Sequence, residues 1–181
     1  MRIIAGIAKG TPLFVPRDGV RPTSDRTREA VFSSLGEKVA GAAVLDLFAG
    51  TGSLGLEAAS RGAATVVFVE KARPSLLALE RNIAAFRQGR VVECPLQIVR
   101  GDVSARLAGL TGTFGLVFAD PPYGDAAQRL IEDTRLPGLL RAGGVLVLES
   151  AARDPLVAGR DWELCREAVY GDTRVSFFRR Q

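Results

Sequence analysis

The amino-acid sequence predicts an α/β fold of Rossmann-like type, with a mostly parallel, seven-stranded sheet that ends in an antiparallel hairpin. From residue 43 onward, short apolar segments alternate with amphipathic ones, which is typical of βαβ units with helices on both faces of a buried sheet. A glycine-rich turn follows the first apolar segment, and Gly171-Asp172, a typical hairpin turn, joins the last two. Because 181 residues suit one hydrophobic core, we expect a single domain over residues 1–181.

The N-terminal segment precedes this alternating pattern. Two short runs, 2–8 and 13–15, are expected to pair as a small β-hairpin, and a basic loop rich in proline and glycine follows to residue 22. Thr23 or Ser24 is expected to cap a helix that runs to about Leu35. We therefore predict a basic extension over residues 1–22 and the main body of the domain over 23–181.

The remaining elements are expected in regular alternation. The expected strands cover residues 43–48, 65–69, 96–99, 114–119, 144–148, 162–170 and 173–179. The expected helices cover residues 53–61, 74–86, 103–110 and 126–140. Pro74 favours the start of the second of these helices, because proline fits the first helical position.

Composition excludes several kinds of site. The chain contains no histidine, so triads, zinc sites and general bases that depend on histidine are excluded, and we expect no metal. The two cysteines, Cys94 and Cys165, form no CxxC pair and are expected to be reduced core thiols of a cytoplasmic protein. No apolar run approaches the roughly 20 residues needed to cross a bilayer, and no signal peptide is expected.

Positive charge is concentrated near the N-terminus. The net charge is +4, and residues 1–30 hold six basic residues against three acidic ones, a balance of +3. Such asymmetry indicates a polyanionic partner. The abundance of arginine also fits a coding bias, but a bias does not account for the clustering. Arg17, Arg21, Arg26 and Arg28 are the candidate phosphate contacts with such a partner, and Arg179 and Arg180 are further candidates.

The glycine-rich turn allows two interpretations. Gly50, Gly52 and Gly55 fit the dinucleotide fingerprint, and Glu70 lies at the spacing of its ribose-binding acid, so an NAD-linked oxidoreductase is one of them. Asp46 favours the other. A carboxylate inside an apolar strand needs a partner, and an amine-bearing cofactor such as S-adenosylmethionine would supply one, whereas a pyrophosphate would be repelled.

Further polar residues follow the expected strands. Glu70 can accept both ribose hydroxyls, although it fits an ordinary strand-end glutamate as well. Asp102 can accept an adenine amino group next to the Val103 N–H, or cap the following helix, and the two roles are compatible. The expected cofactor site comprises Thr23, Asp46, Phe48, Gly50, Gly52, Glu70, Lys71, Asp102, Val103 and Asp120.

The tetrad Asp120-Pro121-Pro122-Tyr123 follows the fourth expected strand, at the edge where open α/β sheets bind ligands. The prolines stiffen the loop and remove N–H donors. The Asp120 carboxylate and the Pro121 carbonyl can hold the two N–H groups of an exocyclic amine and turn its lone pair toward a methyl donor. Tyr123 can stack on a flipped base. The competing interpretation is a Pro-Pro turn with an ordinary aspartate.

The segment from Arg21 to Phe32 also carries two interpretations. It fits a capped amphipathic helix with a solvated charged face. Alternatively, its N-terminus, with Thr23, binds the cofactor carboxylate, and its arginines meet phosphates.

The motifs together resemble a known family. The pattern D-x-F-x-G-x-G at 46–52 is similar to the first motif of class I S-adenosylmethionine-dependent methyltransferases, and Asp-Pro-Pro-Tyr resembles the amino-methyltransferase motif. With R-P-T-x-D-R-x-R-E at 21–29, the order and length resemble the RsmD family over nearly the whole chain. The resemblance implies a single-domain enzyme that methylates guanine N2 of 16S ribosomal RNA in an assembling small subunit. A monomer is expected because no apolar stripe is left over.

Three alternatives remain open. An N6-adenine methyltransferase would share the tetrad but usually carries a separate target-recognition region, for which 181 residues leave little room. An NAD-linked oxidoreductase has no use for the tetrad. An RNA-binding module that keeps a relict cofactor fold would bind RNA without methyl transfer.

Overall fold

The computed structural model describes residues 1–16, 24–88, 90, 92–122 and 124–181. It confirms the predicted seven-stranded sheet, whose strand order is β3-β2-β1-β4-β5-β7-β6. The strands are β1 Ala43–Leu47, β2 Thr65–Glu70, β3 Leu96–Arg100, β4 Phe114–Ala119, β5 Leu140–Ala151, β6 Trp162–Tyr170 and β7 Thr173–Arg180. The first five run parallel, and β7 pairs antiparallel with both β5 and β6. This is the Rossmann-like arrangement with an antiparallel end.

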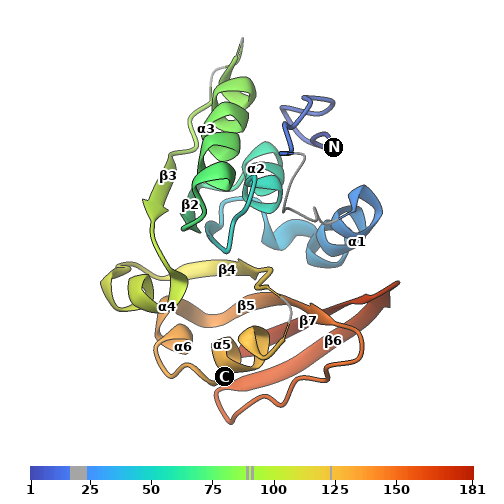
Figure 1. Cartoon of the computed structure of the whole chain (residues 1–181), viewed down its shortest axis with the longest axis vertical. Coiled ribbons are helices and arrows are strands. Elements are labelled where there is room, and N and C mark those ends of the chain that lie inside the picture. Colours follow the sequence, from blue (N-terminus) through green and yellow to red (C-terminus); the bar gives the residue numbers. More distant parts are fainter. Residues whose placement is uncertain (17–23, 89, 91, 123) are drawn as a thin grey trace.

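The helices cover both faces of the sheet (Figure 1). They are α1 Asp25–Leu35, α2 Ser53–Ser60, α3 Arg73–Arg87, α4 Val103–Arg106, α5 Ala126–Glu132 and α6 Leu136–Leu139, with short 3-10 turns η1 Gly36–Lys38 and η2 Leu107–Gly109. Alternation along β1 sends Val44 into the core beneath α1–α3, whereas Leu45 and Leu47 enter the core beneath α4–α6. The site therefore rests on a rigid sheet packed on both sides.

The predicted helix starts are largely confirmed. The Ser24 hydroxyl accepts a hydrogen bond from the Thr27 N–H at 3.0 Å and caps α1. Pro74 lies in the first turn of α3. The long helix predicted over 126–140 is wrong, because the chain breaks between α5 and α6. There the Asp133 carboxylate accepts the Arg135 N–H at 3.0 Å, a local turn that competes with the helix.

The predicted N-terminal hairpin is shorter than expected. One antiparallel bridge joins Arg2 and Pro12, and backbone hydrogen bonds on either side of it pair residues 1–3 with residues 10–13. The N–H groups of Ile4 and Ala5 donate instead to the Glu57 carboxylate on α2, at 2.7 and 3.0 Å, so they are not available to a strand ladder. The short hairpin therefore packs on α2.

Both cysteines are free thiols, but only Cys94 is partly buried. Cys165 is exposed on β6, so its assignment to the core is wrong: β6 is the outermost strand, and the Cys165 position faces solvent. In the part of the chain that the structure describes, no helix is long and apolar enough to cross a membrane.

Candidate active site

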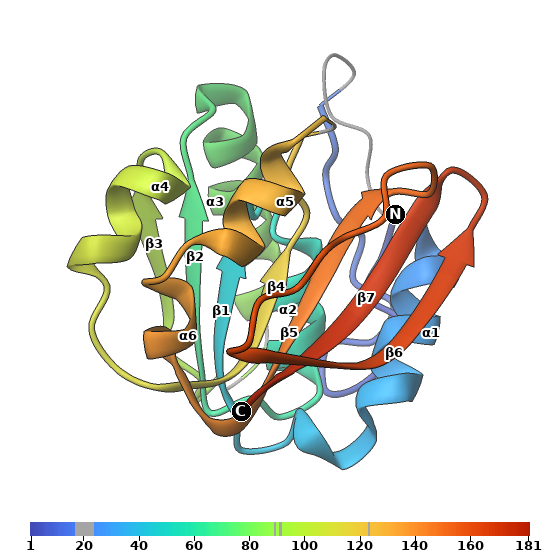
Figure 2. The same ribbon diagram turned by 90° about the horizontal axis from the view of Figure 1, so that it is seen from below.

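The carboxyl ends of the central strands bring the predicted site residues to one edge. Leu47 at the end of β1 pairs with Val69 of β2 and with Ala119 of β4. The residues that follow these three strands therefore emerge side by side, and Figure 2 shows the arrowheads of β1 and β2 pointing to this common edge. The glycine loop, Glu70 and Asp120 all lie here, as expected of an open α/β sheet.

The glycine loop is tight and strained. Phe48 has a φ of 56°, an unfavourable value for a residue with a side chain, and Gly50 and Gly52 have φ values of 55° and 80°. A Cβ at Gly52 would overlap Leu79 of α3. The positive φ values favour glycine at both positions, and at Gly52 a side chain would also displace the end of the Leu79 side chain. The glycines let backbone groups come close to any ligand at this edge.

Asp46 lies beneath this loop and is buried in the sheet. Its Oδ2 accepts a hydrogen bond from the Gly55 N–H of α2 at 2.9 Å. Burial raises the pKa of Asp46 well above its ordinary value; the Gly55 hydrogen bond opposes this shift, while the charges of Asp120 and Glu70 add to it. Because these charges act on Asp46, the carboxyl groups of Asp46, Asp120 and Glu70 lie near one another. A cation here would favour the ionised form.

Glu70 ties the loop to the second strand. Its Oε2 accepts the Gly50 N–H at 2.7 Å, and its Oε1 accepts the N–H groups of Lys71 and Ala72 at 2.8 and 2.7 Å. A carboxylate oxygen can accept about two hydrogen bonds, so Oε2 keeps capacity for one more donor. The role of Glu70 toward a ribose stays a prediction.

Asp102 follows β3 and begins α4. Its Oδ1 accepts the Ser104 N–H at 3.0 Å, which confirms the helix-cap interpretation. Its Oδ2 lies 2.8 Å from the Lys71 Nζ, and this exposed lysine holds the pKa of Asp102 below its ordinary value. The ion pair joins the ends of β2 and β3 on the outer side of the expected cofactor site. Val103 is buried as the first residue of α4.

The tetrad begins where β4 ends. Asp120 is half-buried, Pro121 is buried and Pro122 is exposed. Tyr123 lies outside the described residues, as do Thr23, Arg17 and Arg21. Among the described residues, no group of three or more candidate ligands could hold a metal ion.

Comparisons with known proteins fit this geometry. The sequence model of one family, described as Conserved hypothetical protein 95, matches residues 1–179. The Ribosomal RNA small subunit methyltransferase D of Escherichia coli strain K12 is 34% identical over 100% of this chain and 90% of its own length. The chain belongs to the RsmD family.

Further relatives agree with this assignment. The Ribosomal RNA small subunit methyltransferase D of Haemophilus influenzae is 31% identical over 94% of this chain and 89% of its own length. The solved structure of yhhF from Escherichia coli superimposes with a TM-score of 0.83 at 34% identity, covering 100% of this chain and 98% of that chain. The fold of this RsmD-family member is accordingly that of a class I methyltransferase.

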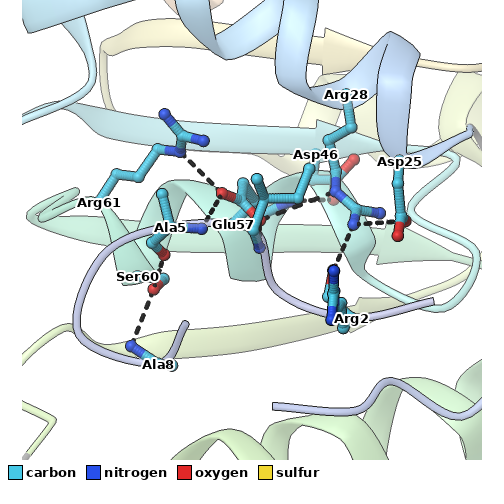
Figure 3. A network of polar contacts seen from close by, with 11 residues as sticks. Arg2, Ala5, Ala8, Asp25, Arg28, Asp46, Glu57, Ser60 and Arg61 are labelled. Atoms are coloured by element: carbon cyan, nitrogen blue, oxygen red, sulfur yellow. Dashed lines mark hydrogen bonds and ion pairs between the residues drawn. The ribbon is translucent and has the colours of Figure 1, made fainter. Parts of the chain in front are cut away.

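One predicted RNA contact of this RsmD-family chain is wrong. The Arg28 side chain is fully buried, and its guanidinium donates to the Arg2 carbonyl and to Asp25 at 3.0 Å, and lies 3.7 Å from Glu57 (Figure 3). Burial lowers the pKa of Arg28, while Asp25 and Glu57 oppose that shift. Arg28 is therefore internal to the fold. Arg26, two residues earlier on α1, is exposed.

Arg179 and Arg180, the two C-terminal candidates for RNA contacts, lie far from the glycine loop. Arg179 pairs with Glu163 at 2.7 Å, and Arg180 donates to the Leu140 carbonyl. Because β7 runs antiparallel to β5, its last residues lie at the sheet edge opposite the glycine loop.

Two residues absent from the predicted site organise its surroundings. Glu57 of α2 accepts the N–H groups of Ile4 and Ala5 and the Arg61 Nε at 2.8 Å. Asn82 of α3 joins Phe14 to the glycine loop at Thr51. The sequence contained one signal for Glu57, because this charged residue interrupts the apolar run of α2. Nothing in the amphipathic pattern of α3 distinguishes Asn82.

Proposed function

We propose that this protein transfers a methyl group from S-adenosylmethionine to the exocyclic N2 amine of a guanine in 16S ribosomal RNA of the small ribosomal subunit. The observation that carries the proposal is the position of Asp120, which lies at the same sheet edge as the glycine loop and close enough to Asp46 for its charge to raise the pKa of that group. A methyl donor on the loop and an amine held by Asp120 would therefore be neighbours.

The charge of the edge supports a cationic cofactor. Asp46, Glu70 and Asp120 interact electrostatically, and the nearby Lys71 side chain forms an ion pair with Asp102. A dinucleotide pyrophosphate would be repelled by these carboxyl groups, whereas the methionine ammonium and sulfonium would be attracted. When bound, S-adenosylmethionine supplies an electrophilic methyl group.

Asp120 and Pro121 provide the acceptors for the substrate amine. The Asp120 carboxylate and the Pro121 carbonyl would accept its two N–H groups and direct the nitrogen lone pair toward the cofactor side of the edge. Asp120 would stabilise the positive charge that develops on nitrogen, and the proton would pass to Asp120 or to water. Tyr123 would stack on the base, and the tetrad alone does not select among bases.

The names of the relatives support ribosomal RNA as the substrate, and the basic N-terminal sixth of the chain supports a polyanionic partner. We propose that the enzyme acts in the cytoplasm as a monomer on the assembling subunit. The test is methylation of unmodified, transcribed 16S ribosomal RNA, free and assembled into small subunits, followed by mass spectrometry of the nucleosides. N2-methylguanosine is expected, and N6-methyladenosine would refute the choice of base.

Cofactor choice is tested separately by calorimetry with S-adenosylhomocysteine and with NAD. Binding of S-adenosylhomocysteine alone is expected. Tight binding of NAD without S-adenosylhomocysteine would overturn the methyltransferase.

A further inference from the structure

An aromatic side chain is held rigidly at the surface beside the site. Phe14 is 42% exposed and is the one aromatic residue among the large exposed hydrophobic side chains that the structure describes. Its backbone is fixed at both polar groups by Asn82, whose Oδ1 accepts the Phe14 N–H at 2.7 Å and whose Nδ2 donates to the Phe14 carbonyl at 3.0 Å. Asn82 itself is buried. The Phe14 ring is therefore held in a fixed position at the surface, where it can contact a partner.

The neighbouring residue of α3 extends this aromatic surface. The Arg81 guanidinium carbon lies 4.3 Å from the centroid of the Phe14 ring. Arg73, Leu77 and Arg81 are spaced four residues apart and are all exposed, so they follow one face of α3. In the described part of the chain, neither Arg73 nor Arg81 forms an ion pair. Phe14, Arg73, Leu77 and Arg81 together form a surface that we call the stripe. It is cationic, and two of its side chains, Phe14 and Leu77, are apolar and exposed to solvent.

The stripe adjoins the site of chemistry. The Asn82 Nδ2 also donates to the Thr51 carbonyl of the glycine loop at 2.9 Å, so one side chain connects Phe14 to the loop. α3 begins three residues after Glu70, at the carboxyl edge of the sheet. Figure 2 shows the blue N-terminal segment rising toward the same edge as the start of α3.

We propose that Phe14 and Arg81, with Arg73, form an RNA-contacting surface on which an unpaired base near the target guanine stacks. This inference rests on the proposed function. An aromatic face with an adjoining guanidinium stacks on bases without regard to sequence, and the arginines can also meet phosphates. The arginines favour a polyanion as the partner, because guanidinium groups pair with phosphates.

The test compares Phe14→Ala and Arg81→Ala with two matched controls at the antiparallel end of the sheet. Leu164→Ala removes a half-exposed apolar side chain from β6, and Arg160→Ala removes an exposed arginine before that strand. Methyl transfer is measured on small subunits assembled on unmodified 16S ribosomal RNA, and S-adenosylhomocysteine affinity is measured by calorimetry. We expect KM for the RNA substrate to rise about tenfold in the two stripe variants, with kcat and cofactor affinity nearly unchanged.

Two further variants separate stacking from folding. Phe14→Leu keeps an apolar side chain and should still raise KM, whereas Phe14→Tyr keeps the aromatic face and should retain the wild-type KM. Wild-type KM values in Phe14→Leu and Arg81→Ala, with an active wild type, would overturn the stacking surface and leave the proposed function intact. A wild type that methylates no ribosomal RNA would overturn the proposed function, and this inference with it.

Discussion

The carboxylate of Glu70 accepts a hydrogen bond from the backbone N–H of Gly50 at 2.7 Å, although 20 residues separate them in sequence. The end of β2 thereby fixes the loop that follows β1. The spacing of these two residues also occurs in dinucleotide fingerprints, where the acid binds the ribose. In this protein Glu70 holds the loop itself, so its effect on cofactor affinity has a structural part.

Glu70→Gln is expected to weaken S-adenosylhomocysteine binding by about ten- to a hundredfold. The amide NH2 would face a backbone N–H donor, either of Gly50 or of Lys71 and Ala72, and hydrogen bonds to a charged acceptor contribute about 1.5–3 kcal/mol. Calorimetry measures the effect. Glu80→Gln is the matched control, because that glutamate pairs with Arg100 on the exposed side of α3. Equal affinity in the two variants would contradict a role for Glu70 in shaping the site.

Asp120→Asn tests the transfer step. The amide offers one acceptor oxygen and no negative charge, so the amine would be less well oriented and the developing positive charge less stabilised. We expect kcat to fall by about a hundredfold or more, and S-adenosylhomocysteine affinity to fall by a smaller factor, because Asp120 also belongs to the expected cofactor site. Asp125→Asn, at an exposed aspartate that pairs with Arg129, controls for charge near the tetrad. RNA binding retained without transfer would argue against a relict binding module, and a normal kcat would remove Asp120 from the chemistry.

The sequence predicted the sheet well because strand burial leaves a direct pattern. β4 is buried along its whole length, and its predicted bounds agree with the structure. The break after α5 was missed because apolar spacing alone does not mark it. Its signals are local: Pro137 and Gly138 lie inside the predicted helix, and the Asp133 carboxylate accepts hydrogen bonds from the backbone and side chain of Arg135. Sequence alone thus located the strand ends that build the site, and with them the residues that follow each strand.

The position of Arg28 shows where sequence reasoning failed. An arginine in a basic helix resembles a phosphate contact, and only tertiary packing reveals Glu57 of α2 facing it (Figure 3). Asn82 was missed for a related reason, since both of its partners lie far away along the chain. A polar side chain that hydrogen-bonds to backbone groups far away in the sequence leaves no periodic pattern in the sequence around it.

Asp46 gives a prediction about pH. Burial raises the pKa of Asp46, so the folded protein holds this proton more tightly than the unfolded chain does. The group therefore favours folding at low pH, and that contribution is lost as pH rises through the folded-state pKa. Asp46→Asn removes this titration and keeps an acceptor for the Gly55 N–H. We expect its Tm to fall less with rising pH than that of the wild type, while S-adenosylhomocysteine binds about tenfold more weakly.

Thermal unfolding across a pH series, from the ordinary aspartate range to neutrality, measures this difference. Asp125→Asn removes an exposed carboxyl and should follow the wild-type profile. Parallel profiles for Asp46→Asn and the wild type would show that the Asp46 pKa does not differ between the folded and unfolded states.

Glu57 gives the last prediction, which concerns stability. Glu57→Ala would leave the N–H groups of Ile4 and Ala5 without their acceptor and would leave the fully buried Arg28 with Asp25 as its remaining carboxylate partner. Removing one partner of a buried ion pair costs about 3–5 kcal/mol, so urea unfolding should show a loss of that order. Glu163→Ala breaks the exposed pair with Arg179 and should cost less than about 1 kcal/mol. Equal losses in the two variants would mean that the contacts of α2 with the N-terminal segment contribute no more than a surface ion pair.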